Sequence, residues 1–155
     1  MRKIKTETPK HPLIQFHDER SFTMTTEINQ GLHHELAQKL KLKLLNIGGF
    51  SAMVNANDPD LPKMVQHGRR FPAKSITMRG EPCRCHSNVA FLWEANMKKV
   101  NICTGYALSK DGIWRCHSWG WHGSRTIETT VKRVAYYGFI LTYEEASEFF
   151  EQNCI

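Results

Sequence analysis

The chain has 155 residues, of which 41% are hydrophobic and 23% charged, and its formal net charge at pH 7 is +6. This length suits one domain with a buried core, and the composition is typical of a soluble globular protein. Because no apolar run reaches the roughly 18 residues of a membrane span and residues 1–10 lack a secretion signal, we expect a single cytoplasmic domain over residues 1–155 without a membrane partner.

The first half of the chain predicts an arm, a helix and an irregular rim. Residues 1–30 show little periodicity, and we expect an extended arm there. Leucines recur every four positions in residues 31–45, which predicts a helix with one apolar face that Gly48 and Gly49 bring to an end. Residues 50–82 are rich in turn-forming proline and glycine, and a long irregular stretch of this kind often forms the rim of a functional site.

The second half predicts a helix, a run of strands and a closing helix. Apolar residues at helical spacing begin at Cys85 and continue to about Met97. Four runs rich in aromatic and β-branched residues then predict strands at Val100–Ser109, Gly112–Trp121, Thr126–Val131 and Val134–Leu141. Thr142 is a suitable N-cap for a last helix, residues 143–152. We expect an α+β fold in which an antiparallel β-meander packs against the helix that starts at Cys85, with N- and C-terminal helices beside it.

Two short turns determine which residues of the meander face one another. If residues 122–123 (His-Gly) form a two-residue turn, His117 lies directly opposite Glu128 and the two side chains share one sheet face. If residues 111–112 (Asp-Gly) form the preceding turn, Tyr106 lies beside His117 on its other flank. The sequence therefore predicts a row of Tyr106, His117 and Glu128 across three strands, and a one-residue slip would break it.

Cys85, His117 and Glu128 together have the residue types of a thiol hydrolase. A cysteine at a helix N-terminus lies at the positive end of the helix dipole, which favours the thiolate, and free amide groups there can stabilise an oxyanion. We predict that Cys85 attacks an amide or ester bond of a peptide- or amide-containing substrate, His117 transfers the proton, and Glu128 orients the imidazole. This chemistry needs no cofactor and no metal.

Each of these assignments has an alternative. Cys83 is a rival nucleophile, although it precedes the helical stripe, and free cysteines such as Cys85 are often buried packing residues. His86 could carry the proton in place of His117, but as the neighbour of Cys85 on a helix it is expected to point away. His117 could equally be a structural histidine in a strand that is rich in tryptophan.

Three further residues are candidates for contact with the substrate. Asn88 follows Cys85 by about one turn and could hold the substrate or the oxyanion, although capping of the helix start is its simpler role. Tyr106 and Trp119 flank His117 in the predicted strands and could wall the site, and core packing explains them equally well.

Two non-catalytic functions compete with the hydrolase. A structural zinc site could draw on six thiols and imidazoles: Cys83, Cys85, His86, Cys103, Cys116 and His117. The Cys-x-Cys spacing is unusual for zinc, and adjacent strand residues point to opposite faces. A basic domain that binds nucleic acid or another anionic partner is the second alternative, but the basic residues are scattered rather than gathered in a stripe.

Five short segments carry a resemblance to known proteins: CHSN at 85–88, TGYAL at 104–108, WRxHSWG at 114–120, IETT at 127–130 and YG at 137–138. They resemble a little-characterised group of small bacterial and phage proteins over roughly residues 80–141. The chain order is similar to that of the papain-like superfamily, including NlpC/P60 peptidases and transglutaminase-like proteins. The resemblance implies a catalytic core at 80–141 with Cys85 as nucleophile, His117 as base and Glu128 as orienting residue, where those families usually have His, Asp or Asn.

Overall fold

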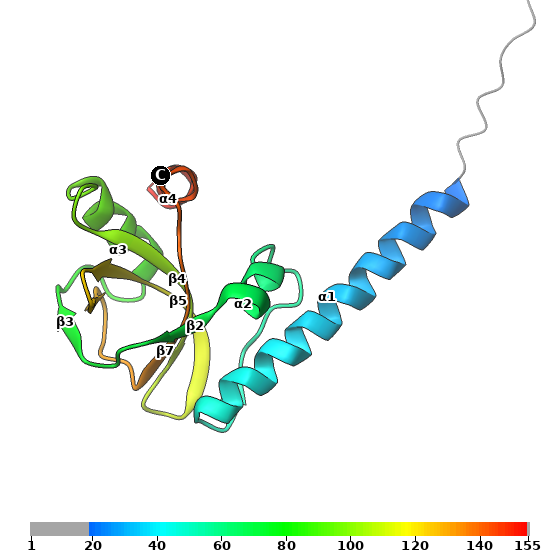
Figure 1. Cartoon of the computed structure of the whole chain (residues 1–155), viewed down its shortest axis with the longest axis horizontal. Helices are drawn as coiled ribbons and strands as arrows, with labels where there is room; N and C mark the ends of the chain where they lie inside the picture. The colour runs from blue at the N-terminus through cyan, green and yellow to red at the C-terminus, as the bar shows by residue number, and fades with distance from the viewer. Residues whose placement is uncertain (1–18, 155) are drawn as a thin grey trace, which may run out of the picture.

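The computed structural model describes residues 19–154, whose strands form one mixed sheet with helices packed beside it (Figure 1). The helices are α1 (Glu19–Ile47), α2 (Leu61–His67), α3 (Cys85–Glu94) and α4 (Tyr143–Asn153). The strands are β1 (Ser51–Ala52), β2 (Arg69–Phe71), β3 (Ser75–Thr77), β4 (Asn101–Leu108), β5 (Ile113–His122), β6 (Arg125–Glu128) and β7 (Ala135–Ile140). Helices and strands both contribute to the core, so the expected α+β class is confirmed.

The sheet has the strand order β2-β7-β4-β5-β6-β3, and β1 pairs with β5 outside this path. Neighbours from β2 to β6 run antiparallel, whereas β3 runs parallel to β6 and β1 runs parallel to β5. The predicted meander is therefore present as β4, β5 and β6, and β7 returns beside β4 rather than beside β6. None of the helices in residues 19–154 is long and apolar enough to cross a membrane.

The elements of the second half agree with the sequence prediction to within a few residues. The helix that starts at Cys85 ends at Glu94, so Met97 lies beyond it and is exposed. At the start of α4, the hydroxyl of Thr142 accepts the Glu145 amide and the Glu145 carboxylate accepts the Thr142 amide, which is a complete capping box. These local signals are strong because each satisfies backbone groups that the helix itself leaves free.

The N-terminal prediction was wrong where the structure describes it. The extended arm was expected over residues 1–30, but α1 already begins at Glu19, and the remainder of the arm, residues 1–18, lies outside the described residues. No proline interrupts residues 19–47, and once a helix has formed each added residue gains a backbone hydrogen bond, so weak periodicity does not stop it. In Figure 1, α1 runs obliquely away from the sheet with α2 beside its C-terminal half.

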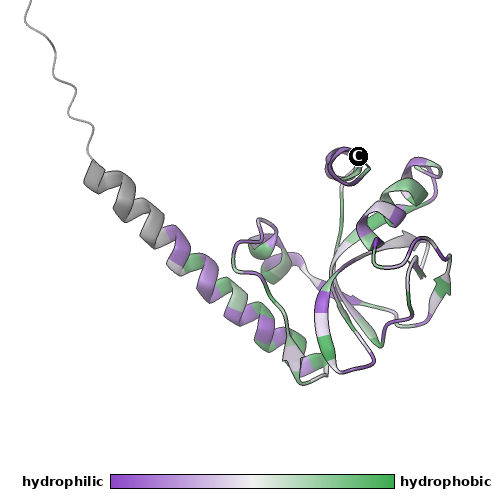
Figure 2. Cartoon of the chain, turned by 180° about the vertical axis from the view of Figure 1, so that it is seen from behind, coloured by the Kyte–Doolittle hydropathy of each residue, from purple (hydrophilic) through white to green (hydrophobic). Residues whose placement is uncertain are grey.

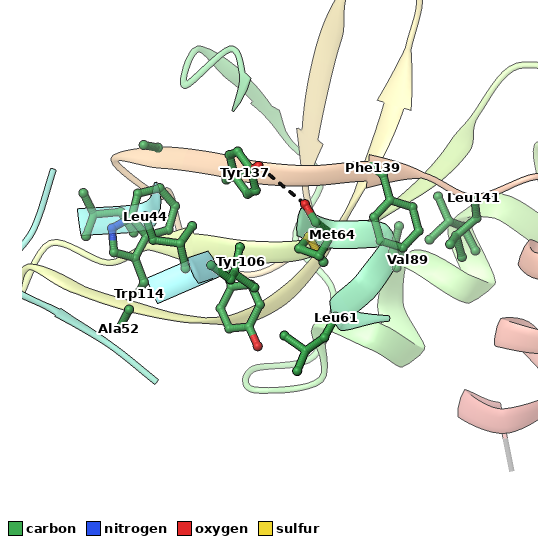
Figure 3. Close-up of a cluster of buried hydrophobic side chains, with 14 of the residues drawn as sticks. Leu44, Ala52, Leu61, Met64, Val89, Tyr106, Trp114, Tyr137, Phe139 and Leu141 are labelled. Atoms are coloured by element: carbon green, nitrogen blue, oxygen red, sulfur yellow. Dashed lines mark hydrogen bonds between the residues drawn. The ribbon is translucent and has the colours of Figure 1, made fainter. Parts of the chain in front are cut away.

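The main hydrophobic core lies between the helices and one face of the sheet. Figure 2 shows hydrophobic and hydrophilic residues alternating along the coloured part of α1, and Leu40 and Leu44 on this helix are fully buried. Figure 3 shows Leu44 near Trp114, and Tyr137 donating a hydrogen bond to the carbonyl of Met64 at 3.5 Å. Met64 lies on α2, a short helix that the irregular rim predicted for residues 50–82 did not include. Seven residues are too few for a periodic signal.

Both hairpin registers differ from the predicted ones. In β4 and β5, Tyr106 pairs with Cys116 and Gly105 pairs with His117, so Tyr106 is one position out of the predicted row. Between β5 and β6, residue 122 pairs with residue 125, so continuing the ladder places Thr130 rather than Glu128 opposite His117. The first change reverses the sheet face of Tyr106, whereas the second, a shift of two positions in the partner, keeps Glu128 on the face of His117.

Candidate active site

The site lies at a gap along one edge of β5. Strand β4 pairs with the whole of the opposite edge, from residue 114 to residue 121. On the near edge, β1 pairs with residues 113–114 and β6 pairs with residues 120–122. Within residues 19–154, the segment between them therefore has no strand neighbour on this edge. The start of α3 lies against this segment, where Nδ1 of His86 contacts Oγ of Ser118 at 2.8 Å.

Cys85 is the first residue of α3 and is partly buried. The first helical hydrogen bond runs from the Asn88 amide to the Arg84 carbonyl at 2.9 Å, so the amides of residues 85–87 have no acceptor within the helix. Burial alone would raise the pKa of the Cys85 thiol, but interactions with the imidazoles of His117 and His86 outweigh it and lower the pKa to about 5. The thiol is therefore ionised at neutral pH.

His117 and Glu128 form a buried ion pair. Nε2 of His117 donates to Oε2 of Glu128 at 2.9 Å, and the side chains are 1% and 0% exposed. Oε2 of Glu128 also accepts from the Tyr136 hydroxyl, and Oε1 accepts from the amide and the hydroxyl of Thr130, each at 2.8 Å. Burial alone would raise the pKa of Glu128, but His117 and these donors lower it to about 2.

The ring of His117 is held so that one nitrogen is engaged and the other is free. Burial would lower the pKa of His117, but the Cys85 thiol and the Glu128 carboxylate raise it above its ordinary value. Trp119 stacks beside the ring with the two planes 20° apart. Nδ1 is buried and has no well-aligned hydrogen-bond partner among the described residues, so it is the ring nitrogen left for the Cys85 thiol, whose interaction raises the pKa of His117.

His86 belongs to the site, contrary to the expectation that it points away. Its Nδ1 contacts the hydroxyl of Ser118, which in turn donates to the hydroxyl of Thr104 at 3.2 Å. The thiols of Cys116 and Cys85 raise the pKa of His86 to about 10, against the opposing effect of burial. Neighbouring residues on a helix point in different directions, but two side chains can still meet the same site when its groups come from more than one element. In the structure the start of α3 lies against β5, where His86 contacts Ser118 and interacts with Cys116, and Cys85 interacts with His117.

A pocket of about 680 Å³ opens beside Cys85, within the range typical of small-ligand sites. Cys83, Cys85, Cys116 and His117 line it together with residues 130–133 and four residues between the end of β3 and the start of α3: Thr77, Arg79, Gly80 and Pro82. Five basic side chains also contribute: Arg79, Lys110, Arg115, Lys132 and Arg133. Among the residues that the structure describes, no aspartate or glutamate lines this pocket. Sequence inspection missed this basic lining because its members come from four separate segments of the chain.

The three proposed substrate-contact residues lie outside this pocket. Asn88 accepts from the Glu81 amide at 3.0 Å and donates to the Glu81 carbonyl at 2.8 Å, so it ties the loop before α3 to the helix. Tyr106 is buried in the main core on the opposite face of the sheet (Figure 3). Trp119 is also fully buried and contacts the site through the ring of His117. The observed contacts of these three residues are therefore loop anchoring for Asn88 and core packing for Tyr106 and Trp119.

The thiols and imidazoles considered for zinc are not gathered into a metal site. Within residues 19–154, no three His, Cys, Asp or Glu side chains are grouped so that they could hold a metal ion. Cys103, a member of that set, is fully buried in a smaller apolar cluster with Trp119 and Tyr136, and burial raises its pKa.

Tyr136 and Thr130 complete the set of groups that hold the site, and neither was a candidate. Tyr136 lies on β7, which is separated from β6 in the sheet by β4 and β5, so no local pattern relates it to Glu128. Thr130 follows Glu128 by two residues, a spacing at which short polar side chains often bond one another.

Compared with known proteins, the chain matches no family model, no curated protein and no solved structure.

Proposed function

We propose that this protein is a thiol-dependent hydrolase or acyltransferase that acts on an amide or ester bond, with Cys85 as nucleophile, His117 as acid and base, and Glu128 as orienting residue. The observation that carries the proposal is the convergence of a thiol of depressed pKa, at a helix start, with an imidazole whose far nitrogen is bonded to a buried carboxylate. A structural role alone does not require the ionised thiol to border an open pocket.

The first step forms an acyl-enzyme. The Cys85 thiolate attacks the carbonyl carbon, and the amide groups at the start of α3 stabilise the negative charge on oxygen. As the carbon–nitrogen or carbon–oxygen bond breaks, protonated His117 gives its Nδ1 proton to the leaving amine or alcohol. The products of this step are a thioester on Cys85, the released amine or alcohol, and a neutral imidazole.

The second step regenerates the enzyme. Neutral His117 takes a proton from water, the resulting hydroxide attacks the thioester carbon, and the carbon–sulfur bond breaks to release a carboxylic acid and the thiolate. If an amine or alcohol replaces water, the same steps transfer the acyl group to it. Glu128 keeps the imidazole in one orientation through both steps and stabilises its charged form.

The chain order and the local layout support a papain-like core as the fold of this site. The cysteine begins a helix, the histidine lies on β5, and the acidic partner lies on the next strand, β6. Glutamate in the third position is longer than the usual partners, and the diagonal register between β5 and β6 accommodates the extra length.

Reaction with 4-nitrophenyl acetate tests the proposal. We expect a burst of nitrophenolate equal to the protein concentration, and an acetyl thioester that peptide mass spectrometry locates at Cys85. Cys85→Ala should abolish the burst, whereas Cys83→Ala, which removes the rival thiol two residues away, should retain it. A burst that survives Cys85→Ala, or that disappears only in Cys83→Ala, would refute the assignment of the nucleophile.

A further inference from the structure

The basic side chains that line the pocket concentrate positive charge locally, beyond what the net charge of +6 alone implies. The lining contains arginine and lysine from the loop before α3, the β4–β5 turn, β5 itself and the segment after β6, and within the described part of the chain it contains no carboxylate. Arg115 is compensated, because it makes a bidentate salt bridge with Asp111 at 2.7 and 2.9 Å. Among the described residues, Arg79, Lys110, Lys132 and Arg133 make no salt bridge.

Arg133 is the most constrained of these cations. Its Nη1 donates to the hydroxyl of Ser109 at 2.6 Å, which holds the guanidinium between the β4–β5 turn and the segment after β6. Its Nε is buried and has no hydrogen-bond partner in the described part of the chain. A buried, unpaired donor on a cation costs free energy unless a ligand satisfies it, and planar oxyanions match guanidinium geometry best.

We propose, building on the function proposed above, that the substrate carries a negatively charged group, a carboxylate or a phosphate, close to the amide or ester bond that Cys85 attacks. The uncompensated basic side chains surround the same pocket as the thiol, so an anion held by them places its neighbouring carbonyl at Cys85. A concave pocket of about 680 Å³ encloses a small anionic group or the charged end of a peptide. A nucleic-acid site would instead be a long exposed stripe.

Two alkylating reagents of nearly the same shape measure directly how strongly the basic side chains favour an anion at Cys85. Iodoacetate and iodoacetamide both lose iodide to a thiolate with formation of a carbon–sulfur bond, and only the first carries a negative charge. We expect the ratio of their rate constants at Cys85 to exceed the ratio for glutathione by tenfold or more at low ionic strength. The excess should shrink in 0.5 M NaCl, because salt screens exposed charges.

Charge-matched variants separate the pocket lining from the net charge and from the two site histidines. In Arg79→Gln/Lys110→Gln/Lys132→Gln, the iodoacetate-to-iodoacetamide ratio should fall about fivefold to twentyfold. Each of the three exposed charges makes a small contribution to the free energy, and the three contributions add. The control, Lys39→Gln/Lys41→Gln/Lys98→Gln, removes the same charge at exposed positions outside the pocket and should change the ratio less than twofold. Equal losses in the two variants, or a wild-type ratio equal to that of glutathione, would overturn the proposal.

Protection experiments then identify the anion. Glutarate or inorganic phosphate should slow the reaction of Cys85 with neutral iodoacetamide, and the stronger protector distinguishes carboxylate from phosphate. Protection by a single-stranded oligonucleotide where neither small anion protects would overturn the proposal in favour of a nucleic-acid site. If Cys85 reacts with neither reagent, the thiol-hydrolase function itself fails. If it reacts with iodoacetamide and shows no preference for iodoacetate, only the charge of the substrate is refuted.

Discussion

The hydrogen bond from Nε2 of His117 to Oε2 of Glu128 spans 2.9 Å and joins two side chains that are almost completely buried. It determines which nitrogen of the imidazole can do chemistry, because Nε2 is engaged and only Nδ1 remains for the thiol. Pairing the two groups also makes their burial tolerable, since an isolated charge in this position would cost several kcal/mol. Glu128, which does not line the pocket, therefore acts on the thiol of Cys85 through the pKa of His117.

The reactivity of Cys85 should persist in mildly acidic solution. Since its pKa is lowered to about 5, the thiolate predominates above that pH, and iodoacetamide labelling should fall only as the pH drops through about 5. Cys154 is an internal comparison, because burial raises the pKa of its thiol and its labelling should begin only in alkaline solution. Rates at each cysteine follow from peptide mass spectrometry between pH 4 and pH 10. Matching profiles for the two thiols would contradict the thiolate–imidazolium pair.

Glu128→Gln should impair both stability and reactivity. Removing one partner of a buried ion pair typically costs about 3–5 kcal/mol, and we expect a loss of this size in urea unfolding. Without the carboxylate the pKa of His117 falls, so the Cys85 labelling profile should move to higher pH. Glu148→Gln, an exposed carboxylate on α4, is the matched control and should change neither measurement by more than experimental error. A stable Glu128→Gln protein with an unchanged profile would show that the pair is dispensable.

The same pair should make the protein sensitive to acid in a defined window. The pKa of Glu128 is lowered from 4.5 to about 2 in the folded state, so the unfolded state binds the proton first as the pH falls. The stabilisation is complete above about 4.5 and is lost progressively toward pH 2. Urea midpoints measured from pH 6 to pH 2 should fall for the wild type, and Glu128→Gln should have a shallower slope over this window. Parallel slopes would assign acid sensitivity to other carboxylates.

Two buried tyrosines on opposite faces of the sheet provide a matched pair. Tyr136→Phe removes the hydroxyl that donates to Glu128 at 2.8 Å, and loss of a hydrogen bond to a charged group costs about 1.5–3 kcal/mol. The pKa of Glu128 should rise, and the Cys85 labelling profile should shift with it. Tyr106→Phe removes a hydroxyl on the far face and should leave that profile unchanged. An effect of Tyr106→Phe as large as that of Tyr136→Phe would restore Tyr106 to the site.

The sequence correctly predicted that His117 and Glu128 share a sheet face, but it placed Tyr106 on the wrong face. Residue 109 bonds to residue 113, so the first turn has three residues with Gly112 in the left-handed region, and one extra residue moves Tyr106 to the other face. The second turn has two residues, as predicted, but they are 123 and 124 rather than 122 and 123. Displacing a turn of unchanged length alters the pairing by two positions and preserves the face.

Long-range features of the site had no counterpart in local sequence patterns. The gap between β1 and β6 arises because a strand of two residues happens to pair with the beginning of β5, and such a short strand gives no periodic signal. The basic lining likewise combines side chains that are scattered in the sequence. Local capping and alternation predict elements, whereas these features depend on where the elements meet.

The surroundings of Glu128 place a limit on the chemistry of the site. Four donors, from His117, Tyr136 and the amide and hydroxyl of Thr130, occupy the lone-pair positions that a carboxylate offers. A carboxylate so fully occupied cannot take up a proton without breaking a bond, so proton traffic must terminate at the imidazole. Under the proposed function, the acid behind His117 would therefore act as a fixed counter-charge, and proton transfer would be left to the imidazole.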